Sequence, residues 1–101
     1  MNENLDSAGG EIVHNHDLQR FELRVDGGLA FADYTRIGDV ITFTHVFVPG
    51  ALRGAGLGSR LAEAALEYAR ASDLTVIAKC PFVAAWIRRH PDYQPLLASS
   101  R

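Results

Sequence analysis

The segment 40–48 constrains the fold more than any other part of the chain. It reads Val-Ile-Thr-Phe-Thr-His-Val-Phe-Val, and its β-branched and aromatic residues favour a strand. Apolar side chains occur at both alternating sets of positions, as in a strand that is central in a covered sheet. Pro49 ends the strand, because proline cannot donate a hydrogen bond to a neighbouring strand. The rest of the chain must therefore build a sheet around this segment.

The residues after this strand predict a parallel crossover. An apolar stripe with helical spacing indicates a helix over 57–72, and an apolar run indicates a short strand over 74–78. Two strands joined through a helix are expected to be parallel, with a right-handed connection. Their carboxyl ends then lie side by side, which is where ligands bind in such sheets.

The remaining segments complete a single α/β (α+β) domain. Upstream, alternating residues and glycine-containing turns indicate an antiparallel meander, and downstream Cys80-Pro81 opens a second helix that Pro91 ends. The expected upstream strands are 12–16, 20–25 and 29–35, with turns at 26–28 and 38–39, and the second helix is 81–90. We expect the domain to span 11–97, with tails at 1–10 and 98–101.

Length and composition exclude several classes of protein. The chain has 101 residues and one cysteine, which leaves room for one domain and excludes a disulfide framework or a clustered cysteine metal site. We expect a cytoplasmic protein, because the polar, acidic first residues do not resemble a signal peptide and no apolar run is long enough to span a membrane. The net charge of -2 combines -5 over residues 1–50 with +3 over residues 51–101. This asymmetry suggests an anionic ligand for the second half.

The segment Arg53-Gly54-Ala55-Gly56-Leu57-Gly58 joins the long strand to the first helix. Glycines let the backbone approach a ligand closely, and a helix start offers free N–H groups and the positive end of its dipole. The segment therefore predicts a cradle for phosphate oxygens, to which Arg53 adds a charged contact. It lacks the Lys-Ser/Thr of a Walker loop and the spacing of a dinucleotide-binding fingerprint. A flexible strand-to-helix loop is the structural alternative.

Together, these motifs resemble the GNAT-type acetyltransferases, in particular a subfamily of very short members. The resemblance runs from about Phe21 to Leu97 and rests on the strand end 45–49, the glycine-rich loop, Cys80 and His90-Pro91-Asp92-Tyr93. It implies that acetyl-CoA lies between two parallel strands that splay apart. By position, the backbone over Val46, Phe47 and Val48 would hold the pantetheine arm. Arg53 to Ser59 (Arg53, Gly54, Ala55, Gly56, Leu57, Gly58 and Ser59) would hold the pyrophosphate.

Residues at the start of the second helix are further candidates. Cys80 adjoins a helix N-terminus and Lys79, both of which favour a thiolate that could carry the acetyl group. A buried, inert cysteine is the alternative. Phe82 stands where related chains often have tyrosine, and we place it among the cofactor-binding residues. Arg88, with Arg89, could reach the ribose phosphate, or could simply complement the helix dipole.

His45 is the candidate general base. By simple alternation it belongs to the strand face that also carries Ile41 and Phe43, and it adjoins the expected thioester site. A hydrogen-bonded core histidine is the alternative, and Glu22 and Tyr34 are weaker candidates for the base. His14 and His16 share a strand face, but nothing nearby supplies further metal ligands, and we expect no metal.

We therefore expect an N-acetyltransferase that moves an acetyl group from acetyl-CoA to a primary amine of a protein or a small molecule, directly or through Cys80. A module that binds coenzyme A or acyl-CoA without turnover is the alternative, because its cofactor loop would be identical. We expect a monomer or weak homodimer with no membrane partner. Nucleic acid is not an expected partner, because the interleaved basic and aromatic residues of RNA-binding sheets are missing.

Overall fold

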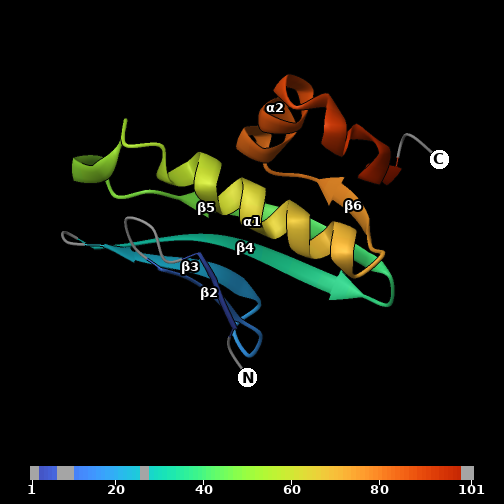
Figure 1. Ribbon diagram of the computed structural model, residues 1–101, viewed down its shortest axis with the longest axis horizontal. Helices are drawn as coiled ribbons and strands as arrows, with labels where there is room; N and C mark the ends of the chain where they lie inside the picture. The colour runs from blue at the N-terminus through green and yellow to red at the C-terminus, as the bar shows by residue number, and fades with distance from the viewer. Residues whose placement is uncertain (1–2, 7–10, 26–27, 99–101) are drawn as a thin grey trace.

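The computed structural model describes residues 3–6, 11–25 and 28–98 (Figure 1). The described strands form one six-stranded sheet in the order β1-β2-β3-β4-β5-β6. The elements are β1 (Glu3–Asp6), β2 (Glu11–Asn15), β3 (Arg20–Val25), β4 (Gly28–Ile37), β5 (Val40–Phe47), α1 (Leu57–Ala71), β6 (Thr75–Ala78) and α2 (Pro81–Arg89), with 3₁₀ helices η1 (Gly50–Leu52) and η2 (Pro91–Leu96). Strands β1 to β5 pair antiparallel, and β6 pairs with β5 in parallel. The expected meander and crossover are both confirmed.

Both long helices lie on the same face of the sheet (Figure 1). In β2, β3, most of β4 and the first half of β5, every second residue points toward the helices and is buried, as Phe21 in β3 and Ile41 in β5 illustrate. The buried side of α1 carries the small and branched residues that its sequence stripe predicts, including Leu61 and Leu66. We call the other side of the sheet the open face, which carries Arg20, Glu22, Phe31, Asp33 and Phe47.

The residues at the helix ends explain where α1 and α2 begin. Gly56 precedes α1 with φ of 79°, a left-handed conformation that glycine adopts without a steric penalty. Pro81 occupies the first turn of α2, where its missing N–H and fixed φ carry no cost. His90 follows the last residue of α2, and Pro91 then opens η2. Among the described residues, neither helix combines the length and hydropathy needed to cross a membrane.

The structure differs from expectation at the N-terminus. We expected residues 1–10 to be a loose tail, but Glu3–Asp6 form strand β1, which pairs with β2 at the edge of the sheet. Such pairing uses backbone N–H and C=O groups, so it needs no apolar alternation in the sequence. The other expected tail residues 1–2, 7–10 and 99–101, and positions 26–27 of the expected turn, lie outside the described residues.

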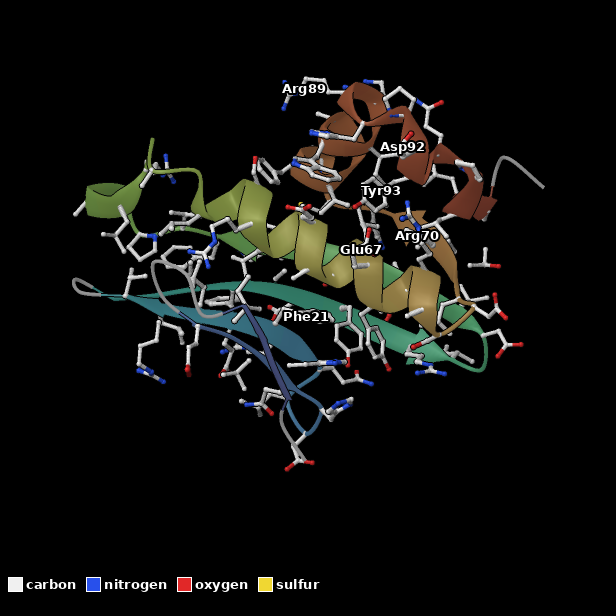
Figure 2. The ribbon with its side chains drawn as sticks, in the orientation of Figure 1. Phe21, Glu67, Arg70, Arg89, Asp92 and Tyr93 are labelled. Carbon is white, nitrogen blue, oxygen red and sulfur yellow. The ribbon has the colours of Figure 1, made fainter. Side chains whose placement is uncertain are left out.

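The C-terminal segment is held against α1. The Tyr93 hydroxyl in η2 donates a hydrogen bond of 2.5 Å to Glu67, and the Arg70 guanidinium lies 4.5 Å from the centre of the Tyr93 ring (Figure 2). Farther along, Leu97 forms a parallel bridge with Val76 of β6. Leu96 and Leu97 also pack against the hydrophobic core.

Candidate functional site

Strands β5 and β6 separate at their carboxyl ends. Their parallel pairing ends at Phe43 and Ala78, where the N–H groups of Lys79 and Cys80 donate to the Phe43 carbonyl at 3.0 and 2.9 Å. The chain then enters α2, whereas β5 continues to Phe47 beside β4. Among the described elements, the backbone of β5 beyond Phe43 therefore faces a gap on its β6 side. This gap is the splay that the family resemblance implied.

A bulge in β5 adjoins the gap. Tyr34 pairs with Phe43 but Asp33 pairs with His45, which leaves Thr44 as the extra residue. The bulge interrupts the alternation of side chains, so the residues beyond it are shifted by one position. The sequence-based placement of His45 on the face of Ile41 and Phe43 is therefore wrong. His45 is exposed and shares the open face with Asp33, its partner across the strands.

A cavity of about 430 Å³ lies beside the gap and the start of α1. One part of its wall is apolar side chains, and another is the glycine-rich backbone between η1 and α1. The lining residues are Val46, Val48, Leu52, Arg53, Gly54, Gly56, Leu57, Gly58, Ser59 and Phe82. Of these, only Leu52 was absent from the sequence-based set. It lies in the one turn of η1, and an apolar residue inside a glycine-rich loop was the signal that could have found it.

The backbone of the loop is shaped to approach a ligand. Gly54 and Gly56 have φ of 90° and 79°, and a Cβ at either would point into open space. The first N–H groups of α1 have no partners within the helix, so they and the helix dipole favour an anion here. Arg53 is exposed beside them, with its Nε 3.5 Å from the Val48 carbonyl oxygen.

Gly58 has a different role, because it allows Phe82 to approach α1. A Cβ at Gly58 would lie 2.8 Å from Cζ of Phe82, closer than side chains tolerate. The ring therefore rests on the first turn of α1 and forms part of the cavity wall. In this way, the start of α2 is brought against the start of α1.

The other sequence-predicted residues lie elsewhere. Phe47 faces the open face, where its ring centre is 5.4 Å from that of Phe31, and Ala55 is exposed in the loop. Cys80 caps α2 and is only 5% exposed, because its side chain belongs to the hydrophobic core. Arg88 lines a second hollow of about 320 Å³, together with Ile77 and other residues of β6 and the C-terminal segment.

Of the remaining histidine and base candidates, His14 and Tyr34 contact each other in the core. His14 is fully buried, and its Nε2 lies 2.6 Å from the Tyr34 hydroxyl. Burial, with the neighbouring His16 and Arg36, lowers the pKa of His14 to about 4. The Tyr34 hydroxyl is therefore hydrogen-bonded to His14 inside the core. Glu22 lies on the open face near Arg20. Within the described part of the chain, the acidic, His and Cys side chains form no group that could hold a metal ion.

This α/β protein has a parallel strand pair that separates beside a glycine-rich helix start. The helix start suits the anionic end of a ligand, and the apolar cavity wall suits an apolar arm. A model of the GCN5-related N-acetyl-transferase family matches residues 20–96, so the chain belongs to this family and the resemblance is confirmed. Mouse NATD1 is 33% identical over 88 residues, covering 82% of this chain and 80% of that protein. Human NATD1 is 28% identical over 83 residues, covering 79% and 74%.

The fold agrees with a solved structure of the same kind. The solution structure of a GCN5-like protein from Staphylococcus aureus superposes with a TM-score of 0.69 at 28% identity. The match covers 89% of each chain. The mixed α/β fold predicted from the sequence is therefore that of the GCN5-related acetyltransferases.

Proposed function

We propose that this protein transfers an acetyl group from acetyl-CoA to a primary amine. The observation that carries the proposal is the cavity beside the β5–β6 gap, in a chain of the acetyltransferase family. Its two kinds of lining match the two parts of coenzyme A. The backbone of Gly54 to Ser59, with Arg53, would bind the pyrophosphate, and Val46, Val48 and Leu52 would contact the pantetheine arm.

The residues at the gap have distinct roles in this proposal. When bound, acetyl-CoA supplies an acetyl group that is activated as a thioester. The amine nitrogen forms a bond to the acetyl carbon while the carbon–sulfur bond breaks, and coenzyme A leaves as its thiolate. His45 accepts the proton that the amine loses. Backbone N–H groups of β5 beyond Phe43, where its pairing with β6 has ended, polarise the acetyl carbonyl.

We favour direct transfer over a route through Cys80. The side chain of Cys80 is buried in the core, and a thiol must reach the acetyl carbon to carry it. Intact-mass spectrometry after incubation with acetyl-CoA separates the two routes. Direct transfer leaves the protein mass unchanged and lets Cys80→Ala retain turnover. An acetyl adduct on Cys80 would establish the two-step route instead.

Calorimetric titration tests the binding half of the proposal. We expect coenzyme A to bind, and Arg53→Gln to weaken it by about tenfold through loss of a charged contact. Pantetheine, which lacks the phosphates, should bind both forms equally, and Arg24→Gln on the open face is the matched control. No binding of coenzyme A at about millimolar concentration would contradict the proposal, because cellular cofactor sites bind more tightly.

Turnover separates an acetyltransferase from a module that only senses acyl-CoA. With a panel of peptide and small-molecule amines, we expect acetylated product by mass spectrometry. His45→Gln should lower the rate by about 100-fold, the usual contribution of a general base. Tight binding of coenzyme A with no acetylated amine would favour the sensor.

A further inference from the structure

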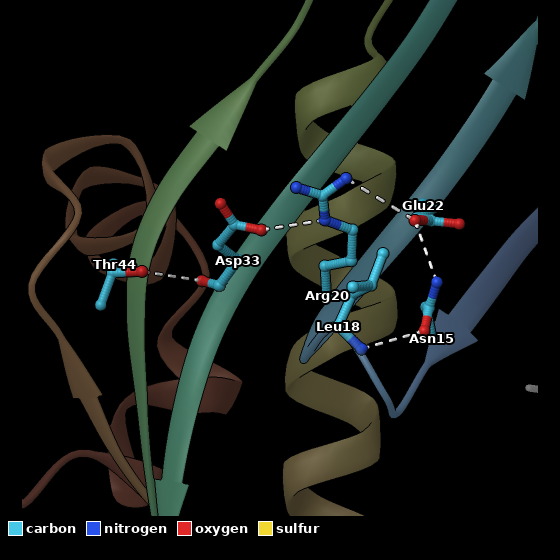
Figure 3. Close-up of polar contacts among 6 residues, drawn as sticks. All are labelled: Asn15, Leu18, Arg20, Glu22, Asp33 and Thr44. Atoms are coloured by element: carbon cyan, nitrogen blue, oxygen red, sulfur yellow. Dashed lines mark hydrogen bonds and ion pairs between the residues drawn. The ribbon is translucent and has the colours of Figure 1, made fainter. Parts of the chain in front are cut away.

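The open face already holds a cation beside aromatic and acidic side chains. The Arg20 guanidinium lies 4.1 Å from the centre of the Phe31 ring. Its Nε donates to Asp33 at 3.2 Å, and Nη1 lies 3.7 Å from a Glu22 oxygen (Figure 3). We call Phe31, Asp33 and Glu22 the cation seat. Its geometry suits a guanidinium or ammonium group.

The cation seat adjoins His45 through the strand register. Arg20 pairs with Asp33, and Asp33 pairs with His45, so the three residues form one row across the open face. Neighbouring strands are about 4.8 Å apart, which places the seat roughly 5 to 10 Å from the His45 position. Residues i and i+2 of an extended peptide point to the same side and are about 7 Å apart.

The seat has more acid than base and is partly accessible. Two carboxylates face one guanidinium, and Asn15 Nδ2 also donates to Glu22 at 3.3 Å (Figure 3). The Arg20, Glu22 and Asp33 side chains are 25%, 15% and 32% exposed. The ion pairs are only partly buried, so water and an incoming cation can reach the carboxylates and compete with Arg20 for them. The surrounding surface is a sheet face with both helices on its other side, which an extended chain can cross (Figure 1).

We propose that the cation seat selects the acetyl acceptor, a protein segment that carries Arg or Lys two residues from the reacting lysine. The flanking cation takes the place of the Arg20 guanidinium between Asp33 and Glu22. The reacting lysine then lies at His45. Arg20, Asp33 and Glu22 are thus specificity-determining residues. This inference rests on the proposed acetyl transfer.

The test compares blocked peptides that each carry a single lysine as acceptor. One series has Arg at position +2 or -2, one has Arg at +1, and one has Gln at these positions. We expect kcat/KM to be about tenfold higher with Arg at a ±2 position than with Gln, mainly through KM. Arg at +1 should give little gain, because that side chain points away from the sheet.

Variants on the open face show whether the seat causes this preference. Asp33→Asn should reduce the ratio of kcat/KM for the Arg(±2) and Gln peptides toward one. Arg20→Gln should raise that ratio several-fold, because it removes the guanidinium that competes with the cation of the substrate. Arg24→Gln makes the same charge change on the same strand and should leave the ratio unaltered.

Several outcomes would overturn the inference. These are equal kcat/KM for Arg(±2) and Gln peptides, equal effects of the Arg20 and Arg24 variants, or a small diamine outperforming every peptide. A stable dimer in sedimentation that Arg20→Gln dissociates would assign the seat to a second copy of the chain. If the Gln peptide is acetylated as well as the Arg(±2) peptides, the role of the cation seat is contradicted but the proposed acetyl transfer is not. If no amine at all is acetylated, the proposed function fails as well.

Discussion

His14 lies in an environment very different from that of a free side chain in water. Its ring stacks on Phe21 with the centroids 4.1 Å apart, and its Nε2 meets the Tyr34 hydroxyl. The ring is fully buried, and its pKa falls to about 4, chiefly because burial disfavours the charged form. The sequence placed His14 and His16 on one strand face without predicting a metal site, and burial makes His14 a component of the core.

This burial predicts a pH-dependent stability. Folding favours the neutral His14, so its contribution is fully present above the unfolded pKa of 6.5 and is lost as the pH falls toward 4. The loss is up to about 3 kcal/mol. Urea unfolding at a series of pH values should show it in the native protein, and His14→Gln should flatten the curve. His45→Gln, at an exposed position, is the control, and an equal effect from it would contradict the assignment.

At the scale of elements, η2 is fastened to α1 through Tyr93. The ring contacts Trp86 of α2, with centroids 5.2 Å apart. Glu67 accepts a hydrogen bond from the Tyr93 hydroxyl, and its carboxylate lies 3.1 Å from the Arg70 guanidinium (Figure 2). Burial and the Glu67 hydrogen bond raise the pKa of Tyr93 to about 12. The contact thus ties α1, α2 and η2 together and steadies the helix whose first turn carries Phe82.

Removal of the hydroxyl should measure this contact. Tyr93→Phe keeps the packing of the ring and should lower the free energy of unfolding by about 1 kcal/mol. Glu67→Gln should have a similar effect, and the double variant should be little worse than either single one. Glu63→Gln, on the same helix, is the matched control. Additive losses from the two variants would show that the two side chains do not act together.

At the scale of the whole molecule, the two halves of the chain differ in net charge and build different surfaces. The half with charge +3 supplies α1, α2 and the loop that lines the cavity. The half with charge -5 supplies β1 to β5, including the acidic residues of the cation seat. In the proposed reaction, the net charge of -2 therefore combines one surface for the anionic cofactor with another for the cationic acceptor.

This division predicts a dependence on salt. When ionic strength rises from about 10 to about 150 mM, the screening length falls from roughly 30 to 8 Å. The affinity for coenzyme A should fall across this range, as calorimetry can measure. Pantetheine carries no phosphate, and its affinity should stay constant. A salt response of equal size for both ligands would exclude phosphate recognition as its cause.

Local patterns predicted most of the fold. Alternation identified the meander, and helical spacing with Pro81 and Pro91 located α2 to within one residue. The glycines of the loop predicted the cavity wall, because positive φ at Gly54 and Gly56 is a local requirement. Strand β1 was not predicted, because a strand that pairs through its backbone at a sheet edge needs no alternating apolar residues.

The sequence by itself determined the parallel crossover and the glycine-rich helix start, because both follow from neighbouring residues. Only the tertiary structure decided which way the side chains at the end of β5 point. The bulge at Thr44 depends on the register with β4, where Asp33 and Tyr34 pair with residues that are not adjacent. That register turns His45 to the open face and places it in one row with Asp33 and Arg20. These three residues come from three different strands, so no single strand sequence predicts that they are neighbours.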